Sequence, residues 1–374
     1  MHLLKLVQGQ VRLGEPLPWG VRDGQGQLLL ARGQVIANDE QLQALLERGA
    51  SVDIEEVRAA AKRAEAEANK RPLSIFALWE RTLWQLDRVL RSAADEPGFP
   101  QRVAELAAYV VSLADRDADI AIYMAVRQDP KRLTIYALAH SVHCAMVARL
   151  VSQRLGWPED KTLTLMKAAL TMNIATLDLQ GRLAAQGVPP TPAQMEQLRP
   201  HPTQGMEALR AAGVDDALWL DAVAQHHEKP DGSGYPQGLR EIGELATVLR
   251  HIDVFMAKMA PRAMRASMPI QLAERQLFQE DGGGPVSASI IKEFGIYPPG
   301  EFVQLKSGEM AVVVRRSANA RSPVAAAITD RQGMPMVNTV VRDTAKPEFT
   351  IASVVADKSL VLRVPPERLY GLPE

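Results

Sequence analysis

The sequence predicts a mainly α-helical protein with a small β-rich unit on each side of a helical bundle. From Ser74 to about Phe294, large apolar residues recur at intervals close to 3.6 residues, which is typical of helices packed around a core. Before and after this region, short apolar runs alternate with turn signals such as Asp23-Gly24 and Ser307-Gly308. At 374 residues, the chain is also longer than a single hydrophobic core usually organises.

We divide the chain into four segments on this pattern. They are a β-rich module over 1–55, a charged connector over 56–72, a helical region over 73–295 and a β-rich tail over 296–374. In the first segment, Asn38 is the expected N-cap of a short helix that stops at Gly49. The connector mixes charges of both signs with alanine, which predicts a solvated helix, and the tail is expected to form a small barrel or an extended hairpin.

Charge and composition exclude several classes of partner. The chain carries 43 Lys and Arg against 44 Asp and Glu, so its net charge of −1 provides no broad basic surface for DNA or RNA. Its single cysteine, Cys144, cannot form an intramolecular disulfide. The first residues lack the pattern of a leader, and no apolar run approaches the roughly 20 residues of a membrane span. We therefore expect a cytoplasmic protein without a membrane span.

An apolar helical stripe over 75–90 leaves the oligomeric state open. It contains Trp79 and Trp84, and either packing into the core or pairing with a second copy in a homodimer accounts for it.

Histidines and a carboxylate in the helical region have the chemistry of metal ligands. His140 lies in YALAHSVHCAMVARL, His201 opens HPTQGMEAL, His226 and His227 are adjacent, and Asp253 lies in VLRHIDVFMAKM. Imidazole and carboxylate groups suit first-row divalent metals, and a helical bundle brings such side chains inward from separate helices.

The segment HHEKPDGSGYPQGL is the most specific motif in the chain. Gly232 and Gly234 permit unusual backbone conformations and Pro236 rigidifies the turn, so a shaped loop directly follows the two histidines. Here the sequence resembles the HD-GYP family, a branch of the HD-domain metal-dependent phosphohydrolases that hydrolyse the bacterial second messenger cyclic di-GMP. The resemblance covers roughly 133–314 and includes AHSVHCA, HPTQG, ATVLRHID and IYPPGEFVQLKSGEMAVVV. It implies a helical HD-domain bundle, placed at about 130–295.

The resemblance also indicates which site residues are kept. By carry-over, His201, His226 and His227 belong to one metal position, whereas His140 and Asp253 belong to the other. The stretch that carries the His-Asp pair of the family reads ALTMNIAT here, so Met172, Asn173 and Thr176 stand at its His, Asp and Lys positions. Asn173 offers only a neutral oxygen and Met172 a soft thioether. We therefore expect at most one divalent transition metal, Fe, Mn or Zn, at the three-histidine position and no confidently assigned catalytic residue. His143 lies three residues after His140 on the same helical face, and it is a further candidate to replace part of the missing metal ligands.

Ligand contacts follow from the same comparison. The family carries basic residues that contact nucleotide phosphates after its last metal aspartate, and Arg262 and Arg265 occupy the matching positions. Tyr235, with Gly234 and Pro236 in the same loop, is expected to stack on or hydrogen-bond the ligand. Met172 and Met256 instead suggest that part of the pocket floor is apolar.

Three functions remain open at this stage. The first is a bacterial signalling protein whose degenerate HD-GYP domain receives cyclic di-GMP or a related nucleotide, or acts on a protein partner, with little or no hydrolysis. The second is an active metal-dependent cyclic di-GMP phosphodiesterase with altered ligands. The third is a protein-interaction scaffold with a vestigial pocket.

Overall fold

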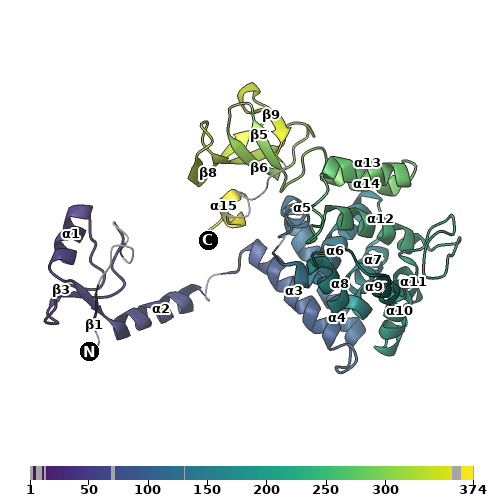
Figure 1. Ribbon diagram of the computed structural model, residues 1–374, viewed down its shortest axis with the longest axis horizontal. Coiled ribbons are helices and arrows are strands. Elements are labelled where there is room, and N and C mark those ends of the chain that lie inside the picture. Colours follow the sequence, from purple (N-terminus) through teal and green to yellow (C-terminus); the bar gives the residue numbers. More distant parts are fainter. Residues whose placement is uncertain are drawn as a thin grey trace. The chain divides into compact units, whose positions relative to one another are not determined.

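The computed structural model describes residues 3–5, 11, 14–68, 72–129, 131–355 and 364–373. The remainder of the predicted N-terminal module, connector and tail, together with residue 130, lies outside the described residues. The chain divides into two compact units, Met1–Leu73 and Ser74–Glu374. Figure 1 colours the two units by their order in the sequence.

The N-terminal unit is a small antiparallel sheet with one helix beside it. The sheet order is β1-β4-β2-β3, formed by β1 (Leu3–Lys5), β2 (Val21–Arg22), β3 (Leu28–Leu30) and β4 (Ser51–Asp53). Asn38 caps α1 (Asp39–Glu47), as predicted, by accepting a hydrogen bond from the backbone of Gln41 at 2.9 Å. The core of this unit consists of Leu17, Trp19, Val21, Ile36, Leu42, Ala50 and Val52.

Helix α2 (Ile54–Ala68) continues directly from β4. Its first turn is held to the sheet because Glu56 accepts a hydrogen bond from the backbone of Gly20 at 2.8 Å and pairs with Arg22 at 3.3 Å. The predicted connector is therefore helical as far as Ala68, and its first turn is attached to the N-terminal module.

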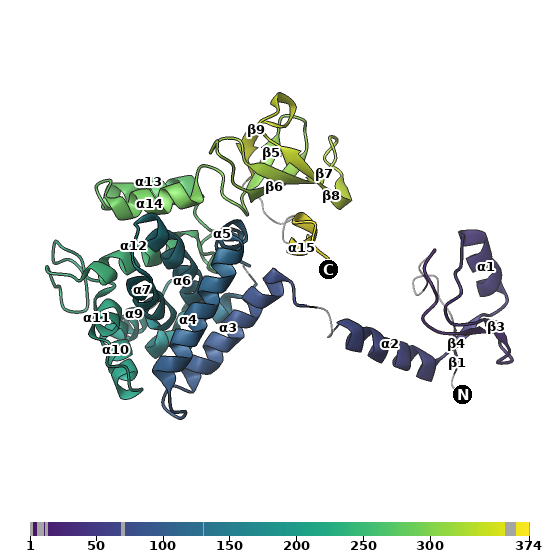
Figure 2. The same ribbon diagram turned by 180° about the vertical axis from the view of Figure 1, so that it is seen from behind.

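The second unit is predominantly helical, which confirms the predicted fold class. Most of its helices surround α6 (Tyr136–Arg154), as Figures 1 and 2 show. The helices are α3 (Ile75–Arg91), α4 (Phe99–Arg116), α5 (Ala118–Val126), α7 (Glu159–Thr171), α8 (Leu177–Ala185), α9 (Pro192–Leu198), α10 (His201–Ala211), α11 (Ala217–Gln225), α12 (Glu244–Met259), α13 (Ile270–Glu280) and α14 (Pro285–Phe294), with short 3₁₀ turns η2 (Leu133–Ile135) and η3 (Ile174–Thr176).

Helix α6 is the buried axis of this unit. With η2 it is long and apolar enough to cross a membrane, but 83% of its most apolar window is buried inside the fold. A helix that is apolar on all sides is expected at the centre of a large core. The predicted stripe on α3 also faces this core, since Trp79 is 1% exposed, whereas Trp84 is 54% exposed.

The C-terminal tail forms a five-stranded antiparallel sheet in the order β8-β7-β6-β5-β9, with β8 and β9 as edges, rather than the predicted barrel or hairpin. The strands are β5 (Phe302–Leu305), β6 (Met310–Arg315), β7 (Val324–Thr329), β8 (Pro335–Asp343) and β9 (Ile351–Val354). Successive side chains point to opposite faces of a strand. Accordingly, Phe302, Val312 and Val314 join the helical core, whereas Val303, Ala311 and Val313 belong to a separate small core.

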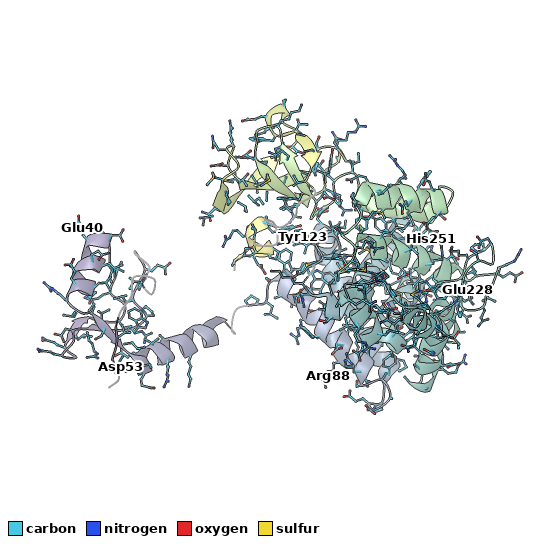
Figure 3. The ribbon with its side chains drawn as sticks, viewed as in Figure 1. Glu40, Asp53, Arg88, Tyr123, Glu228 and His251 are labelled. Atoms are coloured by element: carbon cyan, nitrogen blue, oxygen red, sulfur yellow. The ribbon has the colours of Figure 1, made fainter. Side chains whose placement is uncertain are left out.

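A short helix near the C-terminus, α15 (Pro366–Leu369), connects three parts of this unit. Glu367 accepts a hydrogen bond of 2.6 Å from Ser74, the N-cap of α3, and Thr339 of β8 donates one of 2.8 Å to the backbone of Arg368. Tyr370 packs against Phe76 of α3 and Tyr123 of α5, with ring centroids 5.3 Å apart in both pairs. Tyr123 is labelled in Figure 3. The tail is thus anchored to the start of the helical bundle.

We expect Leu86→Ala to lower the free energy of unfolding by about 2–5 kcal/mol, because the side chain is fully buried on α3 and its loss leaves a cavity. Leu218→Ala removes the same atoms from a side chain that is 63% exposed, so its effect should stay within about 0.5 kcal/mol. Urea unfolding measures both. Equal losses for the two variants would contradict the placement of α3 against the core.

Candidate metal and nucleotide site

Three histidines converge at the ends of two helices. His201 is the first residue of α10, His226 caps the C-terminus of α11, and His227 follows it. One ligand atom from each lies within 4.8 Å of the other two. His201 and His226 are buried, whereas His227 is partly exposed.

Backbone carbonyls set the tautomers of two of these histidines. Nδ1 of His201 lies 2.8 Å from the Leu198 carbonyl and Nδ1 of His226 lies 2.7 Å from the Val223 carbonyl. A carbonyl only accepts, so both Nδ1 atoms carry a hydrogen and both Nε2 atoms present lone pairs. These two Nε2 atoms face each other at 3.2 Å.

This arrangement fits a metal ion. Two nitrogens bound tetrahedrally at the usual Zn–N distance are about 3.3 Å apart. Burial lowers the pKa of His201 to about 4, and it also lowers the pKa values of His226 and His227, so the three rings are neutral near pH 7. Neutral imidazoles with an outer N–H bound to a carbonyl are the form in which histidine binds metals.

His140 and Asp253 are in contact but are already satisfied by each other. Nε2 of His140 lies 2.7 Å from Oδ1 of Asp253, which is a hydrogen bond donated by the ring. Burial raises the pKa of Asp253, but the bond from His140 and the nearby histidines lower it by more, and the net pKa lies well below the usual range. Nδ1 of His140 is buried without a partner in the described part of the chain. If His140 bound a metal through Nε2, its hydrogen would have to move to this unsupported nitrogen.

Cys144 lies beside this pair. Its sulfur is 3.5 Å from Nε2 of His140, one helical turn earlier on α6, and the two residues form a second group of candidate ligands with Asp253. Burial raises the pKa of the Cys144 thiol well above its usual value, which disfavours the thiolate that a metal requires. His143, in contrast, lines a different cavity, so the suggestion that it compensates is wrong.

Met172 and Asn173, which the resemblance places at the His and Asp positions of the family, lie in the core and in an amide network, respectively. Met172 is fully buried in the hydrophobic core. Oδ1 of Asn173 accepts a hydrogen bond of 2.6 Å from Gln180, whose amide nitrogen also lies 3.1 Å from the hydroxyl of Thr176. Asn173 thus offers a single uncharged oxygen, and this oxygen already accepts one hydrogen bond.

The loop after His227 is built on a buried carboxylate. Glu228, labelled in Figure 3, is 0% exposed and accepts hydrogen bonds from the backbone of Gln237, Gly238 and Leu239 at 2.7, 3.2 and 3.0 Å. A Cβ at Gly234 would lie 2.4 Å from the backbone nitrogen of Lys229, so only glycine fits there.

Tyr235 and Pro236 shape the pocket side of the loop. The Tyr235 ring stacks on His227 with centroids 4.6 Å apart and 24° between the planes, and the Tyr235–Pro236 peptide bond is cis. Tyr235 is thereby presented to the three-histidine group.

Of the two arginines predicted to contact the ligand, only Arg262 lines the cavity. Arg262 lines the cavity and donates a hydrogen bond of 3.0 Å to the hydroxyl of Tyr136. Arg265 is exposed, is absent from the residues that line the cavity, and its guanidinium bonds to the backbone carbonyl of Ala257.

His201, His227, Tyr235 and Arg262 are among the residues that line a cavity of about 170 Å³. Its wall contains Asn173 and Gln180, whereas Met172 and Met256 lie in the core, so the prediction of an apolar floor formed by these methionines is wrong. The lining residues are Tyr136, His140, Asn173, Gln180, Leu183, Ala184, Leu198, His201, His227, Tyr235, Asp253, Ala257 and Arg262.

Sequence reasoning missed Tyr136, Cys144, Gln180 and Glu228. Tyr136 and Cys144 lie four residues before and after His140, and this helical spacing is a signal that places all three on one face. Gln180 and Glu228 act through an amide and through backbone N–H groups, and they carry no comparable signal.

Comparison with known proteins shows a similarity to HD domains. Residues 121–282 match the model of a family described as HD domain. This segment, which is less than half of the chain, is thus similar to HD domains. The result confirms the family resemblance that the HHEKPDGSGYP segment indicates.

Two relatives that align with part of this chain are described as bacterial phosphodiesterases. A cyclic di-GMP phosphodiesterase of Pseudomonas aeruginosa is 30% identical over 186 residues, which is 48% of this chain and 45% of that protein. A 3′3′-cGAMP-specific phosphodiesterase of Vibrio cholerae is 29% identical over 140 residues, covering 37% of this chain and 30% of the relative. The chain thus spans less than half the length of these two curated relatives.

One solved structure is similar over much of the chain. It is a protein described as HDG"Y"P from Bdellovibrio bacteriovorus, with a TM-score of 0.48 and 16% identity, covering 78% of this chain and 99% of that one.

We expect Gly234→Ala to disrupt the loop, because the added methyl group would overlap the backbone of Lys229. The variant should lose roughly 1–3 kcal/mol of stability. It should also speed hydrogen exchange at the amides of residues 237–239, which bond to Glu228. Gly187→Ala is the matched control, since no atom lies within 4 Å of the added carbon. Unchanged exchange in Gly234→Ala would contradict the close packing.

Acid should destabilise the metal-free protein through the buried histidines. The pKa of His201 is 6.5 ordinarily and about 4 in the fold, so between these values the unfolded chain binds more protons. The free energy of unfolding should therefore fall as the pH drops from about 6.5 to 4. Urea unfolding in a chelator at several pH values measures this slope, which should be shallower in His201→Gln. An identical slope in that variant would show that His201 is not held neutral.

Proposed function

We propose that the HD domain of this protein receives cyclic di-GMP or a related cyclic dinucleotide, binds at most one transition metal, and hydrolyses the nucleotide slowly or not at all. The observation that carries the proposal is the neutral side chain of Asn173, whose oxygen accepts a hydrogen bond from Gln180. Two-metal hydrolysis of phosphodiesters needs ions about 3.5–4 Å apart that clamp the attacking and leaving oxygens. By the family resemblance, Asn173 stands where a bridging carboxylate would be expected, and its neutral amide is bonded to Gln180.

A single metal is supported by the contrast between the two ligand groups. His201 and His226 point unprotonated nitrogens at each other, and a cation between them relieves the repulsion of the lone pairs. His140 and Asp253 instead satisfy each other through one hydrogen bond. When bound at the three histidines, a divalent metal would supply Lewis acidity and an open coordination position for a phosphate oxygen or water.

A nucleotide ligand is supported by the relatives and by the chemistry of the wall. The named relatives act on cyclic dinucleotides, and the cavity offers a guanidinium at Arg262, an aromatic face at Tyr235 and amides at Asn173 and Gln180. Guanidinium groups suit phosphate, and aromatic rings and amides suit bases. These polar groups weigh against a vestigial scaffold with an apolar pocket.

Metal analysis of the purified protein should find about one transition metal per chain. His226→Ala should lose most of it because the variant removes a nitrogen that faces His201. His140→Ala should retain it, since His140 belongs to the other group. Elemental analysis by mass spectrometry after dialysis measures the ratio. Two metals per wild-type chain, or equal losses in both variants, would overturn the single-metal assignment.

Calorimetric titration should show cyclic di-GMP binding to the wild type, with no turnover after addition of Mn²⁺ or Fe²⁺. Arg262→Ala should weaken binding by about 10- to 100-fold, as expected for the loss of a charge-assisted hydrogen bond to phosphate. Arg265→Ala is the matched control and should bind as the wild type does, because that side chain lies outside the cavity wall. Steady metal-dependent turnover that His226→Ala abolishes would identify an enzyme instead of a receptor.

A further inference from the structure

Helices α3 and α4 share a groove that lies apart from the histidines. The two helices lie side by side in Figures 1 and 2, and only residues 92–98 connect them, so they run in opposite directions. The groove has a volume of about 300 Å³, and Val89 and Leu106 provide apolar surface in its wall. The residues that line it differ from those that line the histidine cavity. The groove therefore belongs to a different surface from the candidate metal and nucleotide site.

Trp84 is a large side chain that the core of this unit does not use. It is 54% exposed, whereas Trp79 on the same helix is 1% exposed. Helical spacing places Trp84 next to Arg81 and Arg88, which are also exposed. Arg88, labelled in Figure 3, lines the groove as well, so the indole lies beside it. Tryptophan and arginine are enriched at the centres of protein interfaces.

The two helices carry opposite charges that are not paired with each other. On α3, Arg81 and Arg88 form no ion pair within the described part of the chain. On α4, Glu105 is exposed and accepts a hydrogen bond of 3.1 Å from Gln101, but it too forms no ion pair among the described residues. These charges are therefore available to a partner that presents the opposite charge at the same place.

The turn between the helices determines which residues lie at the same height. Arg102 donates a hydrogen bond of 3.3 Å to the carbonyl of Ser92. Each residue further from this contact adds about 1.5 Å along either helix, so Arg88 lies close to the height of Glu105. Both side chains line the groove.

At the height of Trp84, the exposed face of α4 carries small side chains. Ala108 and Ser112 follow Glu105 by three and seven residues, so they share its face, and both are exposed. Small residues allow a large side chain of a neighbouring helix to approach closely. One helix thus presents a large apolar side chain, and the other provides space for one.

We propose that α3 and α4 form the interface between two copies of this chain, related by a two-fold axis parallel to the helices. Such an axis places α3 of each copy against α4 of the other at the same height and makes both halves of the contact identical. Trp84 of each copy packs over Ala108 and Ser112 of the other, and Arg88 pairs with Glu105 of the other. The four helices form an antiparallel bundle that covers both grooves.

The size of this face is sufficient for a reversible dimer. Helices α3 and α4 have 17 and 18 residues, so each is about 26 Å long at 1.5 Å per residue. Two helices, each about 10 Å wide, give a face of about 500 Å² per copy, or about 1,000 Å² for both. Specific interfaces begin near this area, and we therefore expect a dissociation constant in the micromolar range.

Sedimentation velocity of the full chain, over about 1–200 µM, tests the proposal because it brackets this range. The wild type should pass from monomer to dimer as its concentration rises. Trp84→Ala should weaken the dimer at least about tenfold, as expected for a central tryptophan. Leu218→Ala is the control, since it removes a side chain that is 63% exposed on α11, and it should leave the dimer unchanged.

Reversal of single charges tests whether the contact joins two copies. Arg88→Glu and Glu105→Arg should each weaken self-association at least about tenfold, because each variant places like charges opposite one another. An equal mixture of the two variants should dimerise as the wild type does, since every reversed charge then faces its opposite. Arg275→Glu is the matched control, because Arg275 is exposed on α13 and forms no ion pair in the described ranges.

Equal melting temperatures should confirm that all variants are folded. A wild type that stays monomeric at the highest concentration would overturn the inference, as would a dimer that Trp84→Ala and both charge reversals retain. A mixture that does not restore the dimer would also overturn it, because the two charges would then not meet across copies. None of these measurements uses metal or nucleotide, so their outcome is separate from that of the proposed function.

Discussion

The site depends on two backbone carbonyls. Leu198 and Val223 each accept a hydrogen bond from Nδ1 of a histidine, at 2.8 and 2.7 Å, and this leaves two nitrogen lone pairs opposed at 3.2 Å in a buried place. Neither ring can donate to the other without giving up its carbonyl, and burial makes protonation unfavourable. A cation between the two Nε2 atoms would remove the repulsion of their lone pairs. The fold thus holds the two rings in an arrangement suited to a cation.

The surrounding elements maintain this arrangement at both helix ends. Helix α10 starts at His201 and α11 ends at His226, so the two rings extend from termini where backbone direction changes. Glu228 accepts hydrogen bonds from three backbone N–H groups over 237–239. Gly234 allows the loop to pack against the backbone of Lys229. The loop thus derives its shape from a buried carboxylate, and its tyrosine is free to face the pocket.

Much of this could be predicted from the sequence, but not all of it. The helical period over 74–294, the cap at Asn38 and the convergence of His201, His226 and His227 depend on local patterns or on an ordered set of motifs. Glu228 escaped prediction because its partners are backbone amides, which carry no residue identity. The methionine floor failed because Met172 and Met256 face the core, and a helical residue turns away from the pocket by about 100° per position. Arg262 and Arg265 differ for a related reason, since a backbone bridge between them folds the chain into a tight turn.

The hydrogen bond between Ser74 and Glu367 brings the beginning and the end of the second unit together. Ser74 is the first residue of this unit, and Glu367 follows the helical bundle and the C-terminal sheet in the sequence. Because α15 is also hydrogen-bonded to β8, Ser74 is connected through α15 to the C-terminal sheet. The histidines of the candidate site lie on other elements, α6, α10 and the end of α11, so the contact that joins the two ends of the unit is formed by residues outside the candidate site.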